Sequence, residues 1–178
     1  MTVTNDLPTK KNSIRDLPRN VWAVGFTSMF MDISSEMVLN ILSLFLANVL
    51  GVTTSIIGLI DGVAEATASI LKLFSGWFSD RIGGRKWVAV FGYGVSAITK
   101  PFFYIAGSWG LVAGVRWADR VGKGIRTAPR DALVADSVTP QTRGLAFGFH
   151  RAMDTAGAML VILIAALVVW LTQKNDLL

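Results

Sequence analysis

Several acidic side chains stand four residues apart inside stretches of sequence that are otherwise apolar. Asp32 and Glu36 form one such pair, and Asp61 and Glu65 form another. Residues four apart lie on the same face of an α-helix. A carboxylate held near a basic group can change partner when it binds a proton, so such faces can bind a polar solute or carry a proton. Ion pairs that hold the helices in register are the structural alternative.

Basic and polar side chains line other apolar stretches at similar spacing. An ionised side chain at mid-bilayer costs roughly 2.5–3.5 kcal/mol, so charged faces of membrane helices must meet one another or water. The candidate solute- and proton-binding residues are Asp32, Glu36, Asp61, Glu65, Lys100, Arg116, His150, Arg151 and Asp154. Their helical faces also include Ser28, Asn40, Ser43, Lys72, Tyr93, Ser96, Tyr104, Arg120 and Lys123. Structural or gating roles are expected for the group nearest the following loop, which comprises Arg120, Lys123, Arg126, Arg130 and Asp131.

The composition indicates an integral membrane protein. Of the 178 residues, 52% are hydrophobic and 16% are charged, and the mean hydropathy is +0.52. A soluble domain has about a quarter of its residues charged. The Lys and Arg residues gather between the apolar stretches, which argues against a nucleic-acid partner. The absence of cysteine excludes disulfides, thiolate metal sites and a cysteine nucleophile.

Five apolar segments are long enough to cross a bilayer, and each is expected to be helical because unpaired strand edges are excluded from lipid. The sequence therefore predicts an all-α membrane protein, a polytopic bundle of transmembrane helices. The predicted helices cover about residues 21–49, 56–78, 87–106, 109–125 and 145–171. The predicted domains are an N-terminal tail over 1–20, the five-helix bundle over 21–171 and a C-terminal tail over 172–178.

Basic residues are distributed unevenly between the two sides of these helices. The loop after the second helix, the loop after the fourth and the N-terminal tail are basic, whereas the other side offers Lys174. The tail contributes Lys10, Lys11, Arg15 and Arg19. Loops rich in Lys and Arg stay in the cytoplasm. We therefore expect a cytoplasmic N-terminus, an extracytoplasmic C-terminus and a location in the plasma membrane, the inner membrane of a bacterium.

One loop, Gly76–Lys86, combines glycines with charges of both signs. Gly83 and Gly84 can adopt the positive φ angle that a tight reversal needs. A carboxylate at the C-terminal end of a helix opposes the helix dipole. Asp80 therefore needs a partner, either a nearby Arg or the N-terminus of another helix. An ordinary topogenic turn, for which glycine and basic residues suffice, is the alternative.

The spacing G-x-x-x-D-R-x-G-x-R-K in this loop resembles the signature loop between the second and third spans of major facilitator superfamily transporters. The residues that carry the resemblance are Gly76, Asp80, Arg81, Gly83, Arg85 and Lys86. In that family the loop latches the two halves of the transporter, and its Asp meets a helix end from the other half. The resemblance therefore implies a gating latch on the cytoplasmic side.

A second motif supports the resemblance. Arg116, followed by Gly122 and Gly124, is similar to the family's pattern in the fourth span, which implies a coupling role for this arginine. The stretches G-I-R-T-A-P-R-D-A-L-V-A-D-S and F-G-F-H-R-A-M-D-T-A-G resemble one bacterial branch of the superfamily. The chain departs from the family at Arg120, where small residues are commoner, and at Gly157, which lacks the following proline of an antiporter motif. Symport, antiport and uniport therefore stay open.

Transporters of this family have two six-helix halves with the solute between them, and the chain resembles five helices of the first half. The implied function is solute transport by alternating access, with protons as candidate coupling ions, as the N-terminal part of a secondary transporter that is not competent alone. The implied partners are the lipid bilayer, a small-molecule solute, protons, and a second transporter half or another chain. A truncated or accessory multi-span protein that acts as a regulatory or assembly subunit is the alternative.

The sequence contains no pattern typical of an enzyme. A Ser-His-Asp set and an HExxH motif are not apparent, and the Gly-Lys-Gly that begins at Gly122 lacks the other elements of a phosphate loop. We expect no enzymatic activity, no cofactor and no metal.

Overall fold

The structure, a computed structural model, describes residues 13–175 and contains helices but no strand within that range. The elements are η1 (Ile14–Asp16), α1 (Arg19–Asn48), α2 (Thr54–Ile82), α3 (Arg85–Thr99), α4 (Phe102–Ile105), α5 (Trp109–Asp136) and α6 (Arg143–Asn175). The predicted all-α bundle is confirmed. Lys10 and Lys11 of the predicted N-terminal tail, and residues 176–178 of the predicted C-terminal tail, lie outside the described residues.

Each of the five predicted helices corresponds to an observed one, although the third is broken. α3 ends at Thr99 and α4 begins at Phe102, because Pro101 has no N–H group with which to continue the helical hydrogen bonds. Beyond the break Tyr104 is 95% exposed, and its place on a polar face with Lys100 stays a prediction. α5 continues to Asp136, well past its predicted end near residue 125.

Three helical segments of the described chain are long and apolar enough to cross a membrane: Arg19–Asn48, Arg85–Ile105 and Arg143–Leu167. α2 and α5 have 29 and 28 residues, which is also the length of a span, but they carry several ionised side chains. These two helices pack together, and their charges pair with each other as described below.

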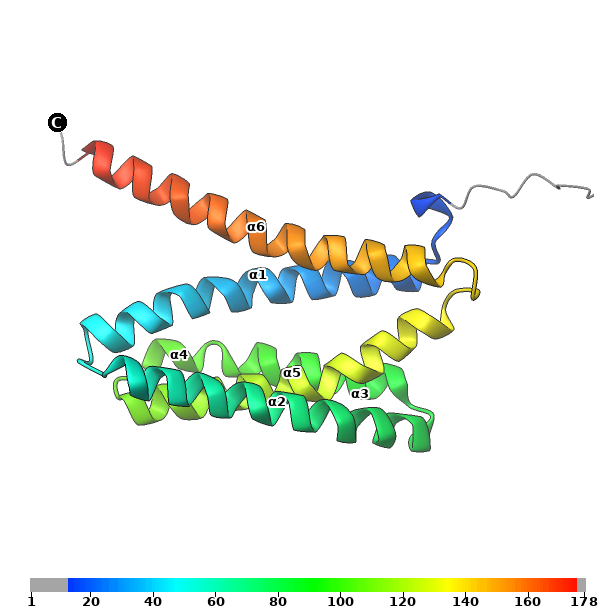
Figure 1. Ribbon diagram of the computed structural model, residues 1–178, viewed down its shortest axis with the longest axis horizontal. Helices are drawn as coiled ribbons and strands as arrows, with labels where there is room; N and C mark the ends of the chain where they lie inside the picture. The colour runs from blue at the N-terminus through cyan, green and yellow to red at the C-terminus, as the bar shows by residue number, and fades with distance from the viewer. Residues whose placement is uncertain (1–12, 176–178) are drawn as a thin grey trace, which may run out of the picture.

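Figure 1 shows α1 and α6 lying side by side, while α2, α3 and α5 form a second group in which α5 packs against both of the others. The η1 turn, the α2–α3 turn and the α5–α6 loop lie at one end of the bundle, on the right in Figure 1. The α1–α2 and α4–α5 turns lie at the opposite end. The loops with the most basic residues therefore share one end.

Two small apolar cores join these groups, one near each end of α1. Their buried residues are Leu17, Val21, Val134 and Ala146 near the start of α1, and Leu42, Leu46, Ala106 and Val112 near its end. In a bilayer such cores stabilise the bundle through van der Waals packing, because lipid chains are as apolar as these side chains. α1 is thus attached at both ends, and the stretch between the cores carries its polar residues.

α5 approaches α2 and α3 closely because it has glycines on opposite faces. A Cβ atom on Gly122 would lie 2.8 Å from the carbonyl oxygen of Gly92 in α3. A Cβ atom on Gly124 would lie 2.7 Å from the carbonyl oxygen of Ala68 in α2. Positions two apart on a helix are separated by about 200°, so the two glycines serve different neighbours. The spacing of the fourth-span motif thus allows close packing on both sides of α5.

α1 and α6 meet through a looser set of contacts. A Cβ atom on Gly157 would lie 3.0 Å from the carbonyl oxygen of Met29, so this glycine lets α6 pass close to α1. Nearer the start of α1, the ring of Trp22 lies 4.4 Å from that of Phe149, centroid to centroid. In this chain Gly157 therefore has a packing role in a helix that proline does not interrupt.

Candidate functional site

Two ion pairs join α2 and α5 in the same register. The Nε atom of Arg116 lies 3.0 Å from the Oδ1 atom of Asp61, and the Nε atom of Arg120 lies 2.9 Å from the Oε1 atom of Glu65. Successive members are four residues apart on each helix, so the two pairs stack along one seam. We call them the α2–α5 ion-pair ladder. The structure thus brings together residues from two predicted polar faces.

The two sides of the ladder differ in exposure. The side chains of Arg116 and Arg120 are 5% exposed, whereas those of Asp61 and Glu65 are 39% and 50% exposed. Removing the partner of a buried cation is strongly destabilising. The ladder therefore has a structural role, while its carboxylates keep an edge open to water, protons or a solute. Lys123, which the sequence also predicts on a polar helical face, is half-buried and lies outside the ladder.

A further polar contact links α5 to α3 where the two helices are closest. The hydroxyl of Ser96 donates to the carbonyl oxygen of Asp119 at 3.1 Å and accepts from Nη1 of Arg126 at 2.6 Å. The guanidinium of Arg126 also lies 4.9 Å from the ring centroid of Tyr93, a cation–π distance. The predicted polar face of the third segment is therefore confirmed for Tyr93 and Ser96.

Asp119 is a buried acidic residue that the sequence analysis did not single out. It is 5% exposed, and its Oδ1 atom has no hydrogen-bond partner among the residues that the structure describes. It lies within electrostatic range of Lys100, Arg116 and Arg126. The available signal was its position three residues after Arg116 on a helix of basic residues. Asp119 offsets part of the positive charge inside the bundle.

Two basic side chains reach across to α1. The Nζ atom of Lys100 donates to the carbonyl oxygen of Met31 at 3.1 Å, and Nη1 of Arg130 donates to the hydroxyl of Ser28 at 2.8 Å. Arg130 also pairs with Asp131, at 2.9 Å between Nη2 and Oδ1. These contacts hold the first half of α1 against α3 and α5. Arg130 and Asp131 therefore have the structural role expected for them.

The α1 polar face, which comprises Asp32, Glu36, Asn40 and Ser43, differs from the ladder. Asp32 and Glu36 are half-buried, and neither forms an ion pair within residues 13–175. The amide of Asn40 donates to the carbonyl of Glu36 at 2.9 Å, and the hydroxyl of Ser43 donates to the carbonyl of Leu39 at 3.4 Å. The uncharged side chains of Asn40 and Ser43 thus form hydrogen bonds within α1, whereas the two carboxylates form none there.

On α6, His150 and Asp154 pair one turn apart. The Nδ1 atom of His150 lies 3.3 Å from an oxygen of Asp154, and the histidine side chain is 4% exposed. Its Nε2 atom has no hydrogen-bond partner in the part of the chain that the structure covers. The predicted shared face of these two residues is confirmed. Arg151 is exposed and lies outside this pair.

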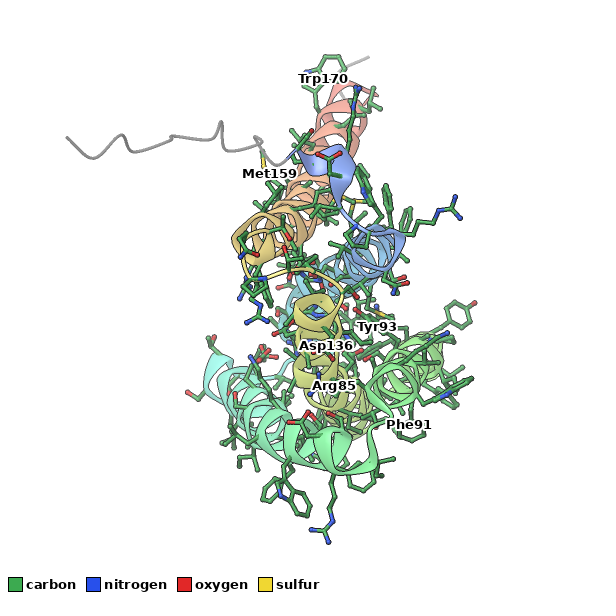
Figure 2. The ribbon with its side chains drawn as sticks, turned by 90° about the vertical axis from the view of Figure 1, so that its right-hand side faces the viewer. Arg85, Phe91, Tyr93, Asp136, Met159 and Trp170 are labelled. Carbon is green, nitrogen blue, oxygen red and sulfur yellow. The ribbon has the colours of Figure 1, made fainter. Side chains whose placement is uncertain are left out.

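Where α2 meets α3, Arg85 bridges two carboxylates. Its Nη2 atom lies 2.7 Å from Oδ1 of Asp80, and its Nη1 atom bonds to Oδ2 of Asp136 at the end of α5. Figure 2 shows Arg85 and Asp136 close together. We call Asp80, Arg85 and Asp136 the loop ion-pair cluster. Asp80 thus has the nearby Arg that the sequence analysis allowed for, while Asp136 was missed because it lies 51 residues from Arg85. Arg81 and Lys86 are exposed and lie outside the cluster.

The glycines of the loop have separate roles. Gly83 caps α2 with a φ angle of 67°, the left-handed conformation that the sequence predicts. Gly84, the N-cap residue of α3, has a φ angle of −103°, so the reversal needs one positive φ angle and not two. A Cβ atom on Gly76 would lie 3.2 Å from the Cβ atom of Ala128, so Gly76 allows α2 to approach α5.

The bundle and its two motifs match a known family over most of the chain. The profile of the Major Facilitator Superfamily covers residues 24–172. The chain belongs to this superfamily. It is 43% identical over 146 residues to an uncharacterized MFS-type transporter of Methanocaldococcus jannaschii, a match that covers 82% of the chain and 36% of that relative. It is 34% identical over 143 residues to uncharacterized proteins of Mycobacterium bovis and Mycobacterium tuberculosis, over 80% of the chain and 34% of each relative.

The family match and the apolar helices together indicate a multi-pass membrane protein of a transporter superfamily. Membership of that superfamily favours a transporter over an enzyme. The resemblance seen in the loop and in the fourth predicted helix is confirmed. The chain spans about a third of the length of the curated relatives that it matches. The superfamily supports a role in transport in general terms.

Proposed function

We propose that the chain takes part in transmembrane solute transport by alternating access, as the N-terminal part of a secondary transporter. The observation that carries the proposal is the α1 polar face, whose carboxylates Asp32 and Glu36 form no ion pair within the described residues. A carboxylate inside a membrane is costly unless it faces water, a solute or another charged group. A hydrated transport pathway along α1 would supply these.

The α2–α5 ion-pair ladder is the proposed opposite wall of this pathway. Lys123 lies within electrostatic range of both Asp32 on α1 and Glu65 on α2, which supports one shared space among the three helices. The residues proposed to bind the solute or a proton are Asp32, Glu36, Asp61, Glu65, Lys100, Arg116, His150, Arg151 and Asp154. Carboxylates without a fixed partner suit a proton-coupled mechanism, because protonation removes a charge that the closed pathway would otherwise bury.

Uptake into membrane vesicles tests this proposal. Vesicles from cells that make the native protein, with any partner chain present, are given labelled small polar and charged solutes with and without a pH gradient. We expect accumulation of one solute class, a loss of that accumulation in Glu36→Gln, and no change in the control Arg143→Gln, whose side chain is exposed at the start of α6. Equal uptake in wild type and Glu36→Gln would contradict the assigned pathway.

A second membrane-embedded part is proposed to complete the pathway. The matched relatives are a little over twice as long as the chain, which supports this proposal. An immunoblot against the N-terminal tail should detect either a product about twice 19.2 kDa or larger, or a chain of 19.2 kDa that purifies with a partner. A product of 19.2 kDa that purifies alone and transports no solute would favour an accessory membrane protein instead.

The loop ion-pair cluster is the proposed gating latch, on a cytoplasmic side assigned from its basic loops. Asp80 is 59% exposed at the side chain, so one edge of its carboxylate remains open to a helix end from another part of the transporter. In the complete transporter, Asp80→Asn should alter transport kinetics and leave membrane insertion intact. Unchanged kinetics in that variant would remove the latch assignment.

A further inference from the structure

An apolar groove of about 600 Å³ runs between α2 and α3 next to the loop ion-pair cluster, a volume typical of ligand sites. Its walls include the aromatic side chains of Phe74, Trp77, Phe78, Trp87 and Phe91. The hydroxyl of Ser75 lies at the base of the groove, 3.2 and 3.1 Å from the carbonyl oxygens of Lys72 and Gly124. Because that hydroxyl is already bonded within the protein, the groove suits an apolar occupant.

Trp77 and Trp87, which line this groove, each have a cation near the ring. The guanidinium carbon of Arg81 lies 5.6 Å from the ring centroid of Trp77, and the Nζ atom of Lys86 lies 5.9 Å from that of Trp87. Neither cation has an ion pair among the residues described, unlike the neighbouring Arg85. A cation on a ring face keeps N–H groups available for a phosphate oxygen.

The end of the groove nearest the α2–α3 turn is expected to lie at the membrane surface. The α2–α3 turn connects two helices that traverse the bilayer, so the residues around it must stand near the headgroups. Tryptophan is enriched at that depth, and Trp77 and Trp87 stand on opposite sides of the groove with side chains 62% and 72% exposed. Figure 2 shows Phe91 of α3 at the periphery of the bundle, so the deeper wall faces outward as well.

We infer that this groove binds an anionic phospholipid, with an acyl chain against the aromatic wall and the phosphate between Arg81 and Lys86. The apolar walls match the chain, and the two cations complement the negative headgroup. A zwitterionic lipid would bring a positive group toward two cations, so the site discriminates by charge. The inference uses the outer surface of α2 and α3 and does not rest on the proposed transport pathway.

Native mass spectrometry of the full chain tests the charge part of this site. The chain is released from detergent in the presence of phosphatidylglycerol or phosphatidylcholine, and retained lipid is counted. Each basic residue near a membrane surface raises affinity for anionic lipid about fivefold, so the Arg81→Gln/Lys86→Gln variant should bind phosphatidylglycerol about 25-fold more weakly. The control Arg19→Gln/Arg143→Gln removes the same charge at the same end of the bundle and should bind as wild type does.

Fluorescence quenching tests the groove itself. In nanodiscs, phosphatidylglycerol with brominated acyl chains should quench tryptophan emission more than brominated phosphatidylcholine does, and Trp77→Phe/Trp87→Phe should abolish the difference. Equal quenching by the two lipids, equal retention of both lipids, or an equal loss in the control variant would overturn the site. A second protein chain seated over Trp77 and Trp87, seen as a stable dimer without lipid-dependent quenching, would overturn it too.

Discussion

The bundle consists of two helix groups, one formed by α2, α3 and α5 and the other by α1 and α6. The groups differ in how closely their helices pack and in whether their main carboxylates form ion pairs. In the first group α5 packs closely against both α2 and α3, and the buried guanidinium groups of Arg116 and Arg120 have carboxylate partners within the group. In the second group the helices meet at Gly25, at Gly157 and through the ring pair of Trp22 and Phe149. The carboxylates of Asp32 and Glu36 have no ion-pair partner within residues 13–175.

The difference separates a self-sufficient part of the bundle from a part whose chemistry needs something more. Charges that meet inside one chain compensate each other when buried, and removing one partner of such a pair destabilises the fold. Charges that do not meet are costly in a membrane until water, a solute, a proton or another chain compensates them. The α1 polar face is therefore where function is expected, and the ladder is the frame that holds α2 and α5 in place.

The largest expected effect comes from closing the space between α5 and α3. Gly122→Ala places a Cβ atom 2.6–2.8 Å from the Ser96 hydroxyl, the Ser96 nitrogen and the Gly92 carbonyl, so it should lower the free energy of unfolding by about 1–3 kcal/mol. Gly157→Ala, at 3.0 Å from the Met29 carbonyl, should cost less. Gly114→Ala on α5 meets nothing within 4 Å and is the control. Denaturation in detergent micelles would give the three values, and equal losses at 122 and 157 would remove the contrast in packing.

The next effect concerns the ladder. A double-mutant cycle with Arg120→Met and Glu65→Met should show a coupling energy of about 1–3 kcal/mol, because the two side chains lie 2.9 Å apart. The 50% exposure of Glu65 places the expected value toward the lower end of that range. A second double-mutant cycle combines Arg120→Met on α5 with Glu36→Gln on α1, in the other helix group. This cycle should show no coupling energy. Coupling of the same size in both cycles would contradict a ladder confined to α2 and α5.

A smaller effect is expected in the loop ion-pair cluster. Asp80→Asn removes one of the two carboxylates of Arg85 and leaves Asp136, and both acids are more than half exposed. Exposed ion pairs contribute about 0–1 kcal/mol, so the free energy of unfolding should change by less than about 1 kcal/mol. Arg85→Gln loses both pairs and should cost more than Asp80→Asn. Thermal unfolding in micelles at low and high salt would show both losses shrinking with salt, and a salt-independent loss would argue against an electrostatic role.

The smallest effect is expected on α1. Glu36→Gln removes a charge that has no ion-pair partner within the described chain, so its free energy of unfolding in micelles should stay within about 0.5 kcal/mol of wild type. The same substitution at Glu65 breaks the pair with Arg120 and serves as the matched comparison. A loss at Glu36 as large as that at Glu65 would reveal a structural partner for the α1 carboxylate.

The sequence predicted the helices well because apolar stretches in a membrane have one available conformation, and it predicted the faces of Asp61, Glu65 and Arg116 because helical spacing is regular. The sequence did not predict that ion pairs would join the second and fourth predicted helices, because those pairs depend on the close packing of α5 against α2 at Gly124. The face of Tyr104 could not be fixed from helical spacing, because the break at Pro101 ends the regular helix before it. Asp119 and Asp136 were missed because their importance lies in neighbours that are distant along the chain.

The most direct test of the central claim is the access of water to the α1 polar face. The chain contains no cysteine, so single-cysteine variants have no background reaction. Glu36→Cys lies on the polar face, and Ile41→Cys, an apolar position that is 66% exposed, lies away from it on the same helix. In intact membranes, a charged thiol reagent that cannot cross the bilayer should label the cysteine at position 36 and leave the one at position 41 unlabelled. Equal labelling of the two positions, or labelling at 41 alone, would contradict a hydrated pathway along α1.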